Sequence, residues 1–181
     1  MKKNHWKEYD NRAISLNVII NSLEKLIIEL KKKEDEVYWY DGIWLLEETE
    51  PIIGITFITL QNYINSSIYD KFNNLEKQYL KYKIGEEFNN SRRTKIELII
   101  AVANYFKHRD HPKELRGETS KILTDFNIQF DKNVDIINSP IFKAIGLLSK
   151  NWEVNDLIEI VVNWRNKLWE IDDCNYEVQK H

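Results

Sequence analysis

The 181-residue chain has a single cysteine, Cys174, close to its C-terminal end. One cysteine excludes an intrachain disulfide and a thiolate metal cage, and it fits a reducing compartment. Uncharged apolar runs of about eighteen residues are absent, so the sequence predicts no membrane span. The start, MKKNHWKEYDNRA, has basic residues but no apolar segment behind them, unlike a secretory signal. We therefore expect a soluble, cytoplasmic protein with no membrane partner.

Glycine and proline are scarce as well, with five and three residues. Few helix breakers, together with many Leu, Ile, Lys and Glu residues, favour helices. The formal net charge of −3 argues against a general nucleic-acid binder. We predict an all-α fold, a single-domain irregular bundle of six to eight helices over residues 1–181. Its ends, about 1–10 and 172–181, are expected to be frayed.

Motifs for common chemistries are missing too. The chain has no Gly-x-Ser-x-Gly elbow and no Gly-rich phosphate loop. A di-metal bundle needs Glu-x-x-His pairs, and Glu47-x-x-Glu50 has no histidine at the right place. We therefore expect no metal and no cofactor, and we assign no catalytic residue. The six tryptophans fall on apolar helical faces, which predicts core positions for them.

The stretch from Thr94 to Phe106 is almost wholly apolar at helical spacing, which is typical of a central helix covered on several sides. We expect the helices over 51–68 and 155–169 to pack against it. Helical spacing also predicts helices over 11–33 and 113–126 and one that begins at Ser139-Pro140.

A narrow polar line runs along the central helix through Glu97, Asn104 and His108. Lys107, His108 and Arg109 end that helix, just before Pro112. This cationic end has two interpretations. It could be a general acid/base or phosphate-binding cluster. It could equally be a helix C-terminus whose cations offset the helix dipole.

The segment that follows Pro51 is rich in β-branched residues, but its apolar residues keep helical spacing well past strand length. It predicts one helix up to about Glu48 and another from Pro51, or a single helix kinked there. A second polar line lies here, with Gly54 leaving room for a close neighbour. We hypothesise that the two lines face each other as one polar seam, made of Glu47, Glu50, Gln61, Glu97, Asn104, Lys107 and His108.

Acidic residues in the polar loops and at helix ends are candidates for binding a partner. They are Glu34, Asp35, Glu36, Glu76, Glu86, Glu87, Asp172 and Asp173. A basic partner would be attracted to such residues by charge complementarity.

The run Asn104-Tyr105-Phe106-Lys107-His108-Arg109-Asp110 resembles the short Asn/His motif of HEPN-type helical domains. Those domains occur in ribonuclease toxins, antitoxins and phage-defence proteins. The resemblance implies an RNA-cleaving site made of Asn104, Lys107, His108 and Arg109. In the catalytic form of that family an arginine stands four to six residues before the histidine, often as Arg-Asn. Here Ala103 precedes Asn104, and this departure argues against ribonuclease activity.

A second resemblance extends from Trp39 to Leu168. It rests on Trp44-x-x-Glu47-Glu48-x-Glu50-Pro51-x-x-Gly54, Gln61-x-Tyr63-Ile64, the Asn104–His108 run and Trp164-Arg165. This combination resembles little-characterised bacterial helical proteins, some of which are immunity proteins of contact-dependent or other polymorphic toxin systems. It implies an immunity-type protein that occludes the active site of a cognate protein toxin, which could be a nuclease. The alternative is a HEPN-like ribonuclease or toxin–antitoxin component, and only this alternative implies a nucleic-acid partner.

Overall fold

The computed structural model describes residues 6–88, 91–111, 115–131 and 134–171. These residues form seven α-helices, and their only β-type pairing is a single bridge between Glu87 and Thr94. The helices are α1 (Arg12–Glu36), α2 (Gly42–Phe72), α3 (Gln78–Tyr82), α4 (Lys95–His108), α5 (Glu118–Asp125), α6 (Pro140–Leu148) and α7 (Asp156–Glu170). The predicted all-α bundle is confirmed.

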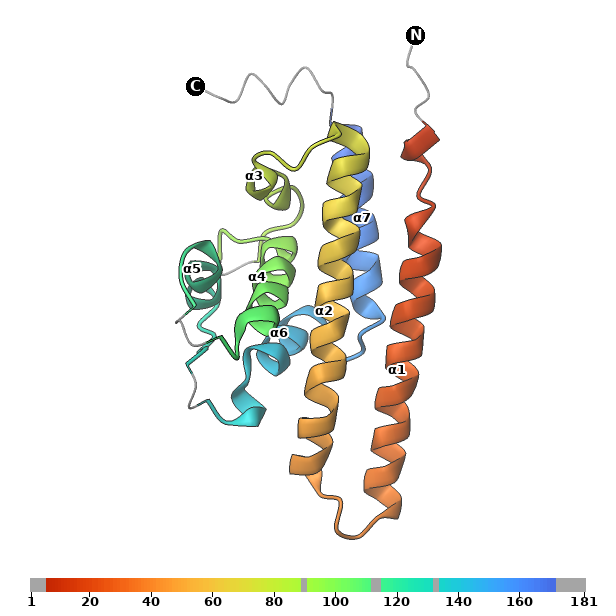
Figure 1. The fold of residues 1–181 in the computed structure, drawn as a ribbon, viewed down its shortest axis with the longest axis vertical. Coiled ribbons are helices and arrows are strands. Elements are labelled where there is room, and N and C mark those ends of the chain that lie inside the picture. Colours follow the sequence, from red (N-terminus) through yellow and green to blue (C-terminus); the bar gives the residue numbers. More distant parts are fainter. Residues whose placement is uncertain (1–5, 89–90, 112–114, 132–133, 172–181) are drawn as a thin grey trace.

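The two longest helices, α1 and α2, form a hairpin that extends past the ends of α4 and α6 (Figure 1). Asp41 starts α2, because its carboxylate accepts hydrogen bonds from the backbone N–H groups of Ile43 and Trp44. Asn73 ends α2 in the left-handed conformation, with φ of 54°. Local backbone interactions therefore fix where α2 begins and where it ends.

Pro51 lies inside α2, so the two alternatives left open at this proline resolve into one helix of 31 residues. Proline removes one backbone hydrogen bond from a helix interior, a substantial cost. The long buried stripe of α2 opposes that cost, because it places five large side chains in the core: Ile53, Phe57, Leu60, Ile64 and Ile68. Thr49 and Glu50, just before Pro51, are buried as well, so packing on both sides of the proline keeps the helix continuous.

The central position predicted for 94–106 is shared between α4 and α2. Every residue of α4 from Ile96 to Ala103 is buried, and α2, α5, α6 and α7 all contact this helix. The predicted packing of the 51–68 and 155–169 segments against α4 is confirmed. Yet α2 also contacts α1, which lies on its side away from α4 and α5 (Figure 1). The core therefore surrounds two central helices, α2 and α4, and α1 is a peripheral helix.

Local signals position the remaining helices. Thr94 and Glu97 form a capping box at the start of α4, as each side chain accepts a hydrogen bond from the other's backbone N–H. Gly117, at φ of 79°, precedes α5, so this helix begins later than the predicted residue 113. Ser139 caps α6 and Pro140 begins it, as predicted.

Residues 6–10, within the N-terminal segment expected to be frayed, are held by α2 and α7. Arg165, which is 3% exposed, donates hydrogen bonds to the carbonyl groups of Lys7 and Glu8. The Tyr63 hydroxyl donates to Asp10. The rest of that expectation, for residues 1–5 and 172–181, lies outside the described residues. In the described part of the chain, none of the helices combines the length and apolar character needed to cross a membrane.

Candidate functional site

The two predicted polar lines meet where α2 packs against α4. The Gln61 side-chain amide donates to Asn104 Oδ1 at 2.9 Å, and Lys107 Nζ donates to Gln61 Oε1 at 2.7 Å. Asn104 in turn donates, over a longer 3.4 Å, to the hydroxyl of Thr119 on α5. The chain of hydrogen bonds lets a buried glutamine lie between two helices that are otherwise apolar.

A second polar contact links the same helices nearer the C-terminal end of α4. Arg109 Nη1 lies 2.5 Å from Glu50 Oε2, and the guanidinium lies 4.7 Å from the centre of the Phe106 ring. That ring packs against α2 at Gly54, where an added Cβ would overlap it. Gly54 thus allows a close approach, as expected, and the neighbour is the Phe106 side chain.

Glu97 belongs to the start of α4 and not to this contact. Its carboxylate accepts from the Thr94 backbone N–H and from Arg93 Nη1, both at 2.9 Å. Arg93 also binds Glu118 and Asp125 of α5. Glu97 therefore helps to hold α5 on α4.

Two further members of the hypothesised polar seam do not take part in the contact between α2 and α4. The side chains of Glu47 and His108 are exposed and make no hydrogen bond or ion pair within the described residues. Glu47 lies one turn before Glu50, whose partner Arg109 already follows the last residue of α4, so no residue of that helix lies opposite. His108 is displaced by about 100° around the helix axis from Lys107. The seam hypothesis was wrong for these two residues and for Glu97.

The four residues of the ribonuclease alternative are also dispersed. Asn104 and Lys107 bind Gln61, Arg109 binds Glu50, and the His108 side chain contacts none of them through a hydrogen bond. Within the described residues, no group of three or more His, Cys, Asp or Glu side chains is placed to hold a metal ion.

The acidic binding candidates lie at three separate places. Glu34, Asp35 and Glu36 end α1, Glu76 lies between α2 and α3, and Glu86 and Glu87 lie between α3 and α4. Asp172 and Asp173, the remaining candidates, are outside the described residues. The candidates therefore do not form one surface.

The end of the α1–α2 hairpin combines the first acidic group with exposed aromatic residues. We call residues 34–48 the tip. Its exposed fractions are 105% for Tyr38, 66% for Trp39, 60% for Ile43 and 49% for Trp44. The prediction that the tryptophans are core residues is wrong for Trp39 and Trp44, and also for Trp152, which is 38% exposed between α6 and α7. The tip has no basic residue and six acidic ones: Glu34, Asp35, Glu36, Asp41, Glu47 and Glu48.

The tip is held in place by a buried anchor. Tyr40 is 2% exposed, and its hydroxyl donates to Glu48 at 2.8 Å. Lys33 lies 3.2 Å from the Glu48 carboxylate and 4.0 Å from the centre of the Tyr40 ring. Burial, with the hydrogen bond to Glu48, raises the pKa of Tyr40 to about 12. The hydrogen bond from Tyr40, followed by Lys33, lowers the pKa of Glu48, so this pair stays in its bonded form at neutral pH.

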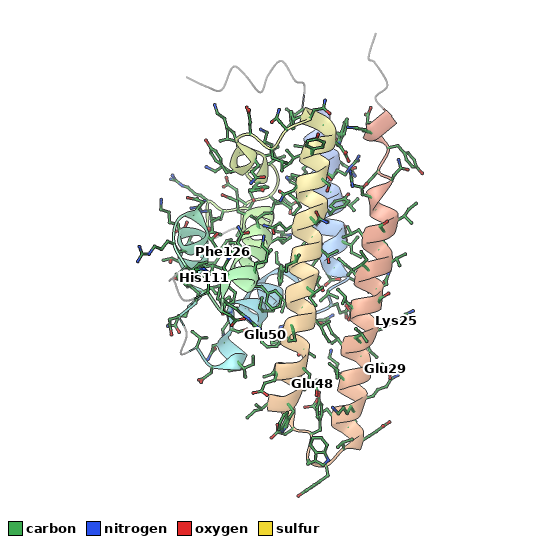
Figure 2. All side chains as sticks on the ribbon, in the orientation of Figure 1. Lys25, Glu29, Glu48, Glu50, His111 and Phe126 are labelled. Atoms are coloured by element: carbon green, nitrogen blue, oxygen red, sulfur yellow. The ribbon has the colours of Figure 1, made fainter. Side chains whose placement is uncertain are left out.

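The exposed rings of the tip also contact one another. The Trp39 and Trp44 rings pack edge to face, with centroids 6.5 Å apart and planes at 90°. Glu48 and Glu50, only two residues apart, lie on different sides of α2, and Figure 2 shows Glu48 towards α1 and Glu50 away from it. The ion pair of Glu50 thus belongs to the core contact with α4, and that of Glu48 belongs to the tip.

Sequence reasoning missed the aromatic part of this surface. Helical spacing indicates an apolar face for Trp39 and Trp44 but does not say whether a neighbouring helix covers it. One sequence pattern could have predicted this surface: residues 34–48 contain six acidic residues, four aromatic residues and no basic residue.

Comparison with known protein families, with curated proteins and with solved structures finds no match to this chain.

Proposed function

We propose that this protein is a binding protein of the immunity type, which neutralises a cognate protein toxin by occluding the toxin's active site through the tip. The observation that carries the proposal is the cluster of exposed aromatic side chains within an acidic segment. Exposed apolar patches rimmed by polar residues mark interaction surfaces. Tryptophan and tyrosine are enriched among the residues that contribute most to binding energy at interfaces.

The charge of the tip selects the chemistry of the partner. Because Lys33 pairs with Glu48, five acidic residues of the tip keep an uncompensated charge, and they would favour a partner that is itself basic, as expected of a protein that acts on nucleic acid. Two of the three lysines just before the tip are already neutralised, since Lys32 pairs with Glu29 and Lys33 with Glu48. Steric occlusion would come from Trp39, Ile43 and Trp44, and the carboxylates would speed association.

The geometry also supports the tip as a rigid surface. Tyr40, Glu48 and the Asp41 cap hold the turn in place, so little conformational freedom remains to be lost on binding. The tip projects beyond the rest of the bundle (Figure 1), which would let it enter a concave active site.

The test begins with the protein encoded directly upstream, because an immunity gene follows the gene of its toxin. We expect the wild-type chain to protect cells that express this upstream protein and to form a complex with it in vitro. Trp39→Ala with Trp44→Ala should abolish protection. Tyr69→Ala, which removes an exposed aromatic residue at the other end of α2, should leave protection intact.

A second experiment compares charge reversal of the acidic candidates at the tip with charge reversal of those near α3. Charge reversal of Asp35 and Glu36 should slow association and weaken its salt dependence. Reversal of Glu76, Glu86 and Glu87 is the matched control and should leave both unchanged. If only the control set affects association, the interface lies elsewhere on the bundle. A chain that neither protects cells nor binds the upstream protein contradicts the immunity function.

A further inference from the structure

The outer side of α1 is a surface that the tip does not include. The inner side of this helix packs on α2 and α7, and its fully buried residues are Leu16, Ile20 and Ile27. On the outer side three branched apolar residues face solvent, with exposed fractions of 67% for Ile14, 62% for Val18 and 44% for Ile28. The outer side of a surface helix is usually polar, so a row of exposed apolar residues there indicates an interaction surface.

These apolar residues belong to a stripe with regular spacing. We call it the outer stripe, and its six members, all exposed, follow one another in alternating steps of four and three residues: Ile14, Val18, Asn21, Lys25, Ile28 and Lys32. At 100° per residue they lie within about 80° of the helix circumference and extend over about 27 Å. Figure 2 shows Lys25 on the side of α1 that faces away from α2. Alternating steps of four and three residues are typical of a helix that packs along a second helix.

The outer stripe is complementary to itself when a second copy of α1 runs antiparallel to it. Turned about the middle of the stripe, the second copy places its Ile28 opposite Val18 and its Lys25 opposite Asn21, and each pair occurs twice. The first pair is apolar on both sides. In the second pair the Asn21 side-chain oxygen can accept a hydrogen bond from the Lys25 ammonium group. Neither of these two side chains has a hydrogen-bond or ion-pair partner among the described residues, so both are available to a second copy.

Charge favours the antiparallel direction over the parallel one. In a parallel pair in register, each residue lies opposite its own copy, so Lys25 would meet Lys25 and Lys32 would meet Lys32. In the antiparallel pair Lys32 lies opposite Ile14, which can pack on the apolar stem of the lysine. The antiparallel pair also brings the exposed Glu36, at the C-terminal end of α1, to the N-terminal end of the second helix. That end has the positive pole of the helix dipole and no acidic residue in its first turn.

The size of the stripe sets the expected strength of such a contact. A strip about 27 Å long on each copy, widened by the exposed Ser15, Ser22 and Glu29 beside it, buries on the order of 1,000 Å² in total. This area is the lower size of a specific interface. The outer stripe therefore suits a second copy bound with micromolar affinity.

We propose that two copies of this chain associate through the outer stripe of α1 as an antiparallel, two-fold symmetric dimer. The same residues of both copies form the interface, as two-fold symmetry requires. The stripe ends before residue 34, so it shares no residue with the tip, and the tips of the two copies point in opposite directions. The proposal goes beyond the immunity function and needs no toxin, so each of the two can fail without the other.

Sedimentation velocity of the full chain, from about 5 to about 500 µM, measures the association against the monomer mass of 21.8 kDa. We expect a dimer to form within this range, and a chain that stays monomeric throughout overturns the proposal. Val18→Glu places a carboxylate opposite Ile28 at two sites and should weaken the dimer about tenfold or more. Because Val18 is 62% exposed, this change should leave the fold intact, which circular dichroism checks. Ile55→Glu, at a 46% exposed isoleucine of α2, is the matched control and should dimerise like the parent.

A pair of variants at position 21 tests the direction of the helices. Asn21→Glu places a carboxylate opposite Lys25 of the second copy and should tighten the antiparallel dimer about threefold. In a parallel dimer the same carboxylate would meet its own copy and weaken association. Asn21→Lys, the matched variant of opposite charge, should weaken the antiparallel dimer, since it faces Lys25. A dimer that Asn21→Glu weakens or leaves unchanged overturns the proposal, and so does a dimer that persists unchanged in Val18→Glu.

Discussion

Phe106 of α4 lies against Gly54 of α2 so closely that a Cβ at position 54 would overlap its ring. The contact brings the two central helices together between their two polar links, Gln61–Lys107 and Glu50–Arg109. A single hydrogen atom in place of a side chain thus sets the separation of the helices that carry the core.

Gly54→Ala tests this close approach. Overpacking against Phe106 should lower the free energy of unfolding by about 1–3 kcal/mol, even though alanine favours a helix more than glycine does. Gly42→Ala is the matched control, because its nearest neighbour would be Glu34 Oε1 at an ordinary 3.5 Å. Denaturant titration measures both. A Gly54→Ala variant as stable as the parent would mean that the Phe106 ring is free to move away.

Double-mutant cycles test the polar contact between α2 and α4. Gln61→Ala and Lys107→Ala should couple by about 0.5–3 kcal/mol, because the two groups share a hydrogen bond in a partly buried position. Glu47→Ala and His108→Ala should be additive within about 0.3–0.5 kcal/mol, since neither touches the other. Coupling in the second pair and additivity in the first would reverse the assignment of the contact.

Acid sensitivity is expected from Asp70. Two hydrogen bonds from Arg12, at 2.7 and 3.2 Å, lower the pKa of this carboxyl group. A carboxyl group whose pKa is lower in the folded state stabilises the protein at pH above its unfolded value, about 4, and this stability is lost as pH falls through the folded value.

Asp70→Asn should therefore be less stable than the parent at neutral pH and lose less stability between about pH 5 and pH 2. Asp35→Asn removes an exposed carboxylate with no partner among the described residues and should follow the parent's pH profile. Thermal unfolding at a series of pH values gives the comparison. Parallel profiles for Asp70→Asn and the parent would show that the Arg12 contact does not form in solution.

An RNA-cleavage assay distinguishes the immunity function from the ribonuclease alternative. We expect the purified chain to leave single-stranded RNA intact, because within the described residues the His108 side chain makes no hydrogen bond to Asn104, Lys107 or Arg109. His108→Ala should behave like the parent. Cleavage by the parent that is lost in His108→Ala would favour the ribonuclease alternative over the immunity function.

Helix content followed from the sequence, and so did the buried faces of α4 and α7. The buried face of α1 did not, because Ile14, Val18 and Leu26 keep helical spacing but are exposed. The spacing of apolar residues in α1, α4 and α7 predicts those helices, because side chains three and four residues apart share one side of a helix. Ser139-Pro140 predicts the start of α6 equally well, because capping is a local interaction. Local geometry also indicates which polar residues lie on a buried line, and Gln61 and Asn104 were found in this way.

Tertiary structure decided which residues of each helix have a partner and which face solvent. Glu47 lies on nearly the same side of α2 as Glu50, but Arg109, just past the end of α4, is already opposite Glu50, and Glu47 faces solvent. Trp39 lies in the turn between α1 and α2 and Trp44 in the first turn of α2, and both are exposed because this end of the hairpin extends past the other helices. Periodicity describes one helix at a time, whereas burial depends on the length and position of its neighbours, and these are set by the packing of the whole bundle.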